Sequence, residues 1–128
     1  MVILDTSIII DHLRQKQKKE TLLEKIAKKE KRDNLAVSII SIQELYEGKS
    51  TADKQKEEYL LSTISPLTIL PYTYEIAQLA GIIARDKTSP TELADAAISA
   101  TAIINNAPLF TLDRKDFGNI EKLKFYQL

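Results

Sequence analysis

Four acidic residues of this chain stand at places where polar side chains could meet: Asp5, Glu44, Asp95 and Asp113. Three of them follow short apolar segments that are typical of buried strands, and Asp95 lies early in an alanine-rich segment. If the strands are parallel, these acids meet beyond the carboxyl ends of the strands, where ligands of open α/β sheets bind. We therefore expect the four carboxylates to line one crevice.

Carboxylates that share a crevice repel one another, so that some stay protonated unless a cation compensates their charge. Mg²⁺ and Mn²⁺ prefer oxygen ligands, and Mg²⁺ keeps several waters beside one or two carboxylates. One or two such ions can activate a water for attack on a phosphodiester and stabilise the leaving oxygen. The four acids therefore predict a Mg²⁺ or Mn²⁺ site and metal-dependent phosphoester hydrolysis.

The 128-residue chain has no cysteine and one histidine, His12. Disulfides, thiol nucleophiles and thiolate metal sites are excluded, and His12 fits a surface or capping role. The 18 Lys and Arg balance the 18 Asp and Glu, so no overall field attracts nucleic acid or a membrane surface. The apolar runs are far shorter than the roughly 20 residues that span a bilayer, and the N-terminus lacks the pattern of a secretory signal. We expect a cytoplasmic protein with one domain over residues 1–128.

Apolar segments that indicate strands alternate along the chain with segments of helical periodicity. The expected strands cover residues 2–4, 35–40, 67–70 and 108–112, with a fifth, edge strand at 123–128. Such alternation is typical of α/β proteins with a parallel sheet. We predict a three-layer α/β sandwich with a mostly parallel central sheet.

Capping patterns and periodicity predict where the helices lie. Residues 11–34 carry a thin apolar stripe among many charges, which predicts a helix with a broad solvated face. Ser41 and Glu44 form a Ser-x-x-Glu capping box that would open a short helix, and Gly48 would end it. A second box at residues 89–92 places proline at the first helical position.

Four motifs occur in a fixed order from one end of the chain to the other. They are an apolar run with Asp-Thr-Ser at 2–7, Ser-Ile-Gln-Glu-Leu at 41–45, Asp-Ala-Ala-Ile-Ser-Ala-Thr-Ala at 95–102, and Thr-Leu-Asp-Arg-Lys-Asp-Phe at 111–117. With these motifs the chain resembles the PIN-domain nucleases and, more narrowly, the VapC toxins of VapBC toxin–antitoxin pairs.

This resemblance implies a PIN-like fold and a Mg²⁺- or Mn²⁺-dependent endoribonuclease that hydrolyses RNA. It also implies a protein that is commonly a homodimer and is held inactive by a cognate VapB-like antitoxin. Asp5, Glu44 and Asp95 match the first three acids of the family's metal site. Asp113 stands where many relatives have asparagine and others an acid. We favour it as the fourth acid and keep Asp116 as the second candidate.

Other side chains near these motifs have expected roles. Thr6 and Thr111 match hydroxyl positions that usually orient the family's carboxylates or a metal-bound water. Basic side chains could flank the crevice and bind RNA phosphates; the candidates are Arg14, Lys16, Arg85, Arg114 and Lys115.

Two alternatives to a nuclease stay open at this point. A strand-end aspartate such as Asp5 also suits a protein that carries a covalent aspartyl-phosphate. The chain lacks the second aspartate two residues later that haloacid-dehalogenase-like phosphatases carry, which weakens this hypothesis. The other alternative is a catalytically silent PIN-like subunit that keeps its acidic pocket and acts in binding or as a scaffold.

Overall fold

The computed structural model of the protein describes residues 1–15, 19–87 and 91–128. Its helices (α), short 3-10 helices (η) and strands (β) follow one another along the chain in this order: β1 (Val2–Leu4), α1 (Thr6–Arg14), α2 (Leu22–Lys29), η1 (Arg32–Asn34), β2 (Leu35–Ser38), α3 (Ile39–Glu47), η2 (Lys49–Ala52), α4 (Lys54–Ile64), β3 (Thr68–Leu70), α5 (Tyr74–Asp86), α6 (Leu93–Ile104), β4 (Leu109–Phe110) and α7 (Arg114–Phe117).

The four strands form one sheet in the order β3-β2-β1-β4, and every neighbouring pair is parallel. In the register of this sheet, Ile3 of β1 lies beside Ala36 of β2 on one side and beside Leu109 of β4 on the other. β1 is therefore an inner strand of the sheet, with β2 on one side and β4 on the other. The predicted parallel α/β sheet is confirmed.

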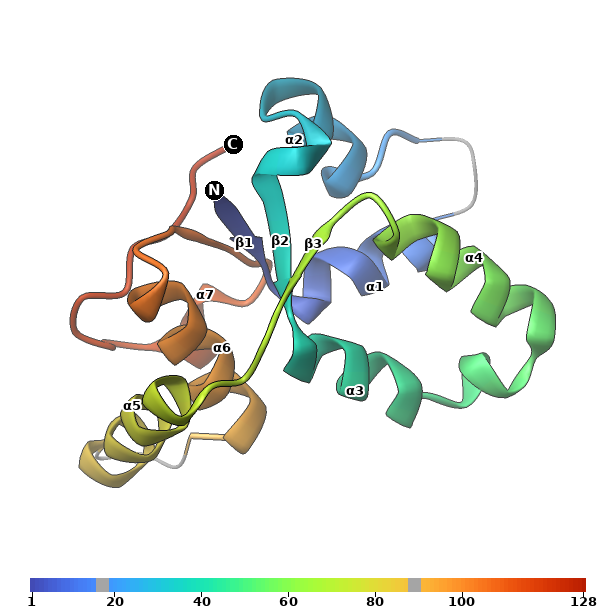
Figure 1. The fold of residues 1–128 in the computed structure, drawn as a ribbon. Coiled ribbons are helices and arrows are strands. Elements are labelled where there is room, and N and C mark those ends of the chain that lie inside the picture. Colours follow the sequence, from blue (N-terminus) through green and yellow to red (C-terminus); the bar gives the residue numbers. More distant parts are fainter. Residues whose placement is uncertain (16–18, 88–90) are drawn as a thin grey trace.

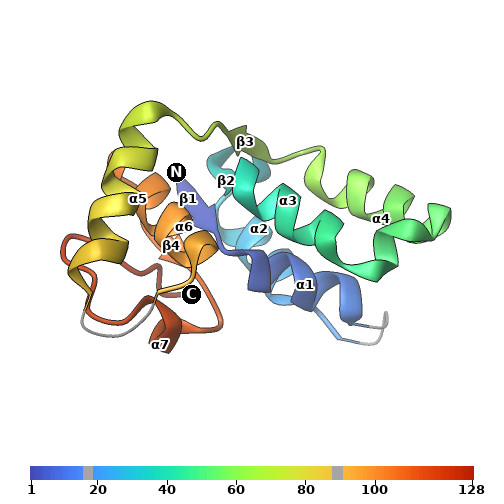
Figure 2. The same ribbon diagram turned by 90° about the horizontal axis from the view of Figure 1, so that it is seen from below.

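Helices cover both faces of the sheet. Successive side chains of a strand point to opposite faces, so each strand contributes to the core on both sides. Val2 and Leu4 belong to a core cluster with buried residues of α1, α2, α3 and α4. Ile3 points to the opposite side and packs in a second cluster with Ile98 of α6 and Phe117 of α7. Figure 1 shows the strands between these two groups of helices, and Figure 2 shows the same division from below. The predicted three-layer arrangement is confirmed.

The prediction of one helix over residues 11–34 is wrong, because α1 ends at Arg14 and α2 begins only at Leu22. Thr21 forms the N-cap of α2: its side chain accepts a hydrogen bond from the Glu24 amide, and the Glu24 side chain accepts one from the Thr21 amide. This reciprocal capping box satisfies two amides that a continuous helix would have bonded internally. Periodicity alone did not reveal it, because both helices place their apolar residues on the same core.

The predicted capping box at Ser41 is also wrong. β2 ends at Ser38, whose side chain accepts a hydrogen bond from the Ile40 amide, so that Ser38 is the N-cap of α3. Ser41 is instead buried in the first turns of this helix. The helix therefore starts earlier than expected, and Glu44 lies in its second turn. Gly48 follows the last residue of α3, as predicted.

Two further expectations are corrected near the C-terminus. The segment 123–128 is not a strand: its described backbone pairing with the sheet is one parallel bridge between Phe125 and Leu109. Glu92 takes the N-cap position of α6, so the helix begins later than the predicted box would place it. Ser89 and Pro90 of that box lie outside the described residues.

In the parts of the chain that are described, no helix has the length and apolar character needed to cross a membrane.

Candidate functional site

A cavity of about 730 Å³ lies beyond the carboxyl ends of β1, β2 and β4. All five acids that the sequence singles out line it: Asp5, Glu44, Asp95, Asp113 and Asp116. They come from the first residue after β1, from α3, from α6 and from the segment that contains α7. The structure thus brings together residues that are up to 111 positions apart in the chain, as the parallel sheet predicts.

Asp5 is held by two hydroxyl groups from opposite ends of the chain. It follows β1 at the N-cap position of α1 and is only 6% exposed. The hydroxyls of Ser7 and Thr111 each donate a hydrogen bond of 2.7 Å to the same carboxylate oxygen, Oδ2. Thr111 in turn accepts a bond of 2.9 Å from the Asp113 amide, which ties the loop after β4 to this carboxylate. The orientation of Asp5 therefore depends on the docking of both β1 and β4.

Glu44 is bound by a hydroxyl of the first helix. The Thr6 hydroxyl donates to Oε1 of Glu44 over 2.6 Å, and the Ser41 hydroxyl lies 2.8 Å from that of Thr6. Burial raises the pKa of Glu44; the bond from Thr6 opposes this rise, while the charges of Asp5, Glu47 and Glu92 add to it. The net rise indicates that Glu44 meets more negative charge and less water than an exposed glutamate does.

Asp95 has the most perturbed acidity of the cavity's acids. Burial is the largest cause, followed by the negative charges of Asp5, Asp116, Glu92 and Glu44; together they raise the pKa of Asp95 from its ordinary value of 3.8 to about 6. A divalent cation bound among these carboxylates would favour the charged form and lower this pKa. A bound cation would thus reduce the repulsion among these carboxylates.

Asp113 and Asp116 both line the cavity and are exposed, but they differ in their effect on the pKa of Asp95. Asp116 is among the charges that raise the pKa of Asp95, and Asp113 is not. Asp113 precedes α7, and its carbonyl accepts a bond of 2.9 Å from the Asp116 amide. The two acids therefore occupy neighbouring positions, with Asp116 acting more strongly on Asp95.

Two residues with a place in this site were missed by sequence reasoning as site residues. Sequence reasoning included Ser7 only as part of the Asp-Thr-Ser motif, yet its hydroxyl binds Asp5 and accepts a bond of 3.2 Å from the Leu112 amide. Glu92 was read as part of a capping box, yet it lines the cavity and its charge raises the pKa of both Glu44 and Asp95. The signal for Glu92 was its position three residues before Asp95, a spacing that brings the N-cap residue of a helix beside the first turn.

The predicted basic residues are distributed unevenly. Lys115 lines the acidic cavity, together with Lys87, which the sequence did not single out. Arg85 pairs with Asp86, and the Arg114 guanidinium donates to the Tyr126 carbonyl over 3.1 Å. Arg14 lines a neighbouring groove, and Lys16 lies outside the described residues. Lys87 and Lys115 are thus placed to contact an anion that enters the acidic cavity.

The carboxylate and hydroxyl oxygens that line the cavity fit Mg²⁺ or Mn²⁺, which prefer oxygen ligands. Within residues 1–15, 19–87 and 91–128, no three Asp, Glu or His side chains lie close enough together to form a ready-made metal cage. An ion held here would accordingly keep some of its ligands as water, as Mg²⁺ commonly does.

Comparison with known proteins points to one family. The PIN domain family model matches residues 2–123, whereas no curated protein matches the chain. One similar solved structure is VapBC2 from Rickettsia felis bound to a DNA fragment from its promoter, with 22% identity over 98% of this chain and 96% of that one and a TM-score of 0.80. Another is DNA-bound VapBC from Salmonella typhimurium, with 22% identity, coverages of 98% and 96%, and a TM-score of 0.83. FitAcB from Neisseria gonorrhoeae has 24% identity, coverages of 98% and 97%, and a TM-score of 0.78. At these identities the likeness shows a shared fold.

Proposed function

This chain belongs to the PIN domain family, and we propose that it is a metal-dependent endoribonuclease that hydrolyses RNA phosphodiester bonds. The PIN family consists typically of nucleases that use divalent metal ions. The observation that carries the proposal is the gathering of Asp5, Glu44 and Asp95 in one cavity, where the pKa of Asp95 is raised to about 6. Isolated caps or surface acids would not show this mutual effect, because it requires proximity.

The chain's own residues divide the work of this site. Asp5, Glu44 and Asp95 would hold Mg²⁺ or Mn²⁺, which when bound supplies positive charge that activates a water and stabilises the leaving oxygen. Thr6, Ser7 and Thr111 hold the carboxylates of Glu44 and Asp5 in place through the hydrogen bonds described above. Lys87 and Lys115 would contact the phosphate and offset the negative charge of the cavity.

The fourth acid of the site is the point on which we revise the expectation from sequence. We propose Asp116 ahead of Asp113, because Asp116 contributes to the raised pKa of Asp95. The Mn²⁺ affinities of Asp113→Asn and Asp116→Asn distinguish the two. A larger loss of affinity for Asp116→Asn supports this order, and a larger loss for Asp113→Asn reverses it.

We also propose that the protein is the toxin of a type II toxin–antitoxin pair. Its support is the shared fold with chains of VapBC and FitAcB, and with a toxin–antitoxin complex from Klebsiella pneumoniae at 24% identity and a TM-score of 0.75. A VapB-like antitoxin would then bind it and suppress cleavage, and the active form would be a homodimer in the cytoplasm. Light scattering of the purified protein tests the dimer, and co-expression with a candidate antitoxin tests the relief of toxicity.

Cleavage of nucleic acids by purified protein tests the central proposal. Total RNA and single-stranded DNA are incubated with Mg²⁺, Mn²⁺ or EDTA, in parallel with the Asp5→Asn variant. Discrete RNA fragments that disappear with EDTA and with the variant are expected. Folded, inhibitor-free protein that cleaves nothing under any condition would refute the nuclease and leave a binding or scaffold subunit.

A further inference from the structure

A second cavity of about 420 Å³ adjoins the acidic one between α1, α3 and the η2–α4 segment. The two cavities share Ile10 and Glu44 as lining residues, so they lie side by side. Figure 2 shows α1, α3 and α4 extending together from the end of the sheet at which β1 and β2 pass into helices. We call this second cavity the basic groove.

The basic groove has a charge opposite to that of the acidic cavity. Arg14, Lys49 and Lys56 line it, and all three are exposed. Within the described parts of the chain, none of the three forms an ion pair. The acid in its lining is Glu44, at the end shared with the acidic cavity. The overall charge of the protein is zero, so this concentration of cations is a local feature rather than a consequence of composition.

The other lining residues suit a polymer with both polar and apolar parts. The Ser50 hydroxyl can donate a hydrogen bond, and apolar side chains such as Leu13 and Leu45 offer surface to ribose or bases. Phosphates receive most of the hydrogen bonds that proteins make to nucleic acids, from cationic and hydroxyl side chains of this kind.

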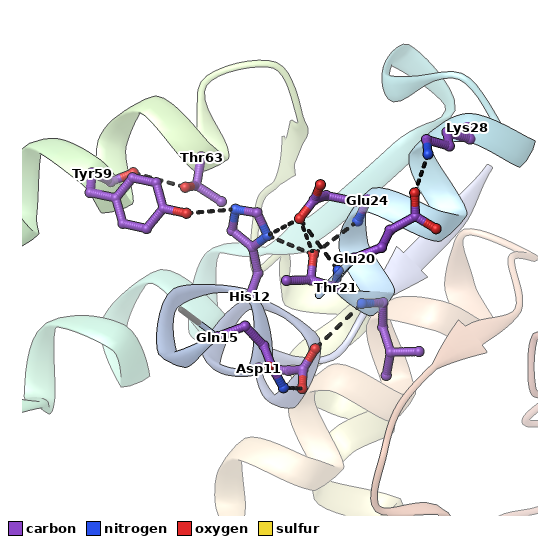
Figure 3. Close-up of polar contacts among 10 residues, drawn as sticks. Asp11, His12, Gln15, Glu20, Thr21, Glu24, Lys28, Tyr59 and Thr63 are labelled. Carbon is purple, nitrogen blue, oxygen red and sulfur yellow. Dashed lines mark hydrogen bonds and ion pairs between the residues drawn. The ribbon is translucent and has the colours of Figure 1, made fainter. Parts of the chain in front are cut away.

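The far wall of the groove, α4, is attached to the body of the protein through His12. As Figure 3 shows, His12 of α1 lies between Thr21 and Tyr59. Its Nδ1 is 2.7 Å from the Thr21 hydroxyl, and its Nε2 is 3.1 Å from the hydroxyl of Tyr59 in α4. A second bond to α4 comes from α3, whose Tyr46 hydroxyl donates to Glu57 over 2.7 Å. The α4 wall of the groove is therefore held at two points, through His12 and through Tyr46.

We infer that the basic groove binds phosphates of the RNA strand on one side of the scissile bond. This inference rests on the proposed nuclease function, because the scissile phosphate must lie in the adjoining acidic cavity. Arg14 lies nine residues beyond Asp5, or roughly 13 Å along α1 at 1.5 Å per residue. A stacked strand covers this distance with about four nucleotides at 3.4 Å each. An RNA substrate thus needs about four nucleotides on that side of the cut to use the whole groove.

The test compares two pairs of substitutions. Lys49→Ala with Lys56→Ala removes two groove cations, whereas Lys25→Ala with Lys54→Ala removes two exposed lysines that line neither cavity. Each pair is combined with Asp5→Asn to prevent cleavage, and binding of a fluorescein-labelled single-stranded RNA is followed by anisotropy between 50 and 200 mM salt, a range typical of such titrations. The groove pair should weaken binding roughly tenfold and reduce the slope of log K against log salt by about 1.4, the value for two phosphate contacts on a single strand.

Cleavage by the otherwise unchanged protein gives the second readout. For an RNA with at least five nucleotides on each side of the cut, the groove pair should raise KM and leave kcat unchanged. For an RNA with one nucleotide on each side, both constants should stay the same. The inference is overturned if the groove pair binds RNA as tightly as the control pair, or if both RNA lengths respond alike. Failure of the parent protein to cleave any RNA would instead count against the nuclease itself, which keeps the two hypotheses separate.

Discussion

Replacing Asp95 with asparagine should stabilise the folded protein while it abolishes metal-dependent cleavage. The raised pKa means that the folded state holds the Asp95 proton more tightly than the unfolded chain does. The stability gained from this tighter proton binding is therefore fully present below pH 3.8 and is lost as the pH rises through about 6. At neutral pH the ionised carboxylate of Asp95 costs the fold free energy, and Asp95→Asn removes this cost.

The magnitude follows from the size of the pKa change. A rise from 3.8 to about 6 corresponds to about 3 kcal/mol at 1.36 kcal/mol per pH unit. Asp95 is only partly buried, and solvent screening reduces this to roughly 1–2 kcal/mol. With an unfolding entropy of about 2.1 cal/mol/K per residue over this chain, the expected increase in Tm is about 4–7 °C.

Thermal unfolding followed by circular dichroism at pH 7.5 in EDTA measures this increase. Asp33→Asn is the matched control, because Asp33 is exposed and lines neither the acidic cavity nor the basic groove. At pH 4 the gain should shrink to about one fifth, since Asp95 is then largely protonated in the folded state. Mn²⁺ should raise the Tm of the parent protein more than that of Asp95→Asn. An Asp95→Asn protein that is no more stable than the parent at pH 7.5, or whose gain is the same at pH 4, would refute the reasoning.

Three further substitutions test other features of the structure. Thr111→Val keeps the shape of the side chain but removes the donor to Asp5, so we expect a 10- to 100-fold loss of cleavage or Mn²⁺ affinity, of the size found for outer-shell groups; unchanged values would contradict a positioning role. Ser38→Ala removes the N-cap of α3 and should cost about 1 kcal/mol of unfolding free energy, measured by urea titration. Ser99→Ala removes a buried hydroxyl that has no hydrogen-bond partner within the described structure, so it should raise the unfolding free energy by about 1 kcal/mol with cleavage unchanged. A loss of stability in Ser99→Ala would show that this hydroxyl is paired in solution.

The strands and the acids that follow them could be predicted from sequence for a simple physical reason. A short run such as Val2 to Leu4 is buried on both faces of a parallel sheet, so it is apolar throughout and stands out from its surroundings. The polar residue at which such a run ends, Asp5, then lies at the edge of the sheet. The same logic placed Asp113 near the cavity, whereas Glu44 lies in the second turn of α3, beyond the end of β2 at Ser38. The roles of Glu44 and Asp113 as metal ligands stay a prediction.

Helix starts were harder to predict, because several residues near each start can act as caps. Ser38 and Ser41 are equally suited by type, and the choice between them depends on where the strand pairing of β2 ends. Similarly, the break before Thr21 depends on α2 folding back onto the sheet. The effect of Glu92 on Asp95 was hidden for a related reason, because it arises from burial and charge in the assembled cavity.

The hydrogen bond from Thr111 to Asp5 also determines how early during synthesis of the chain the site can form. The two residues are 106 positions apart, so a ribosome that adds about 5–20 residues per second needs roughly 5–20 s to synthesise the intervening chain. A nascent chain that has not yet reached β4 lacks a neighbour of β1 in the sheet and one of the two hydroxyls that orient Asp5. Translation therefore delivers the first acid of the site long before its support, which delays maturation of the site until Thr111 has been synthesised.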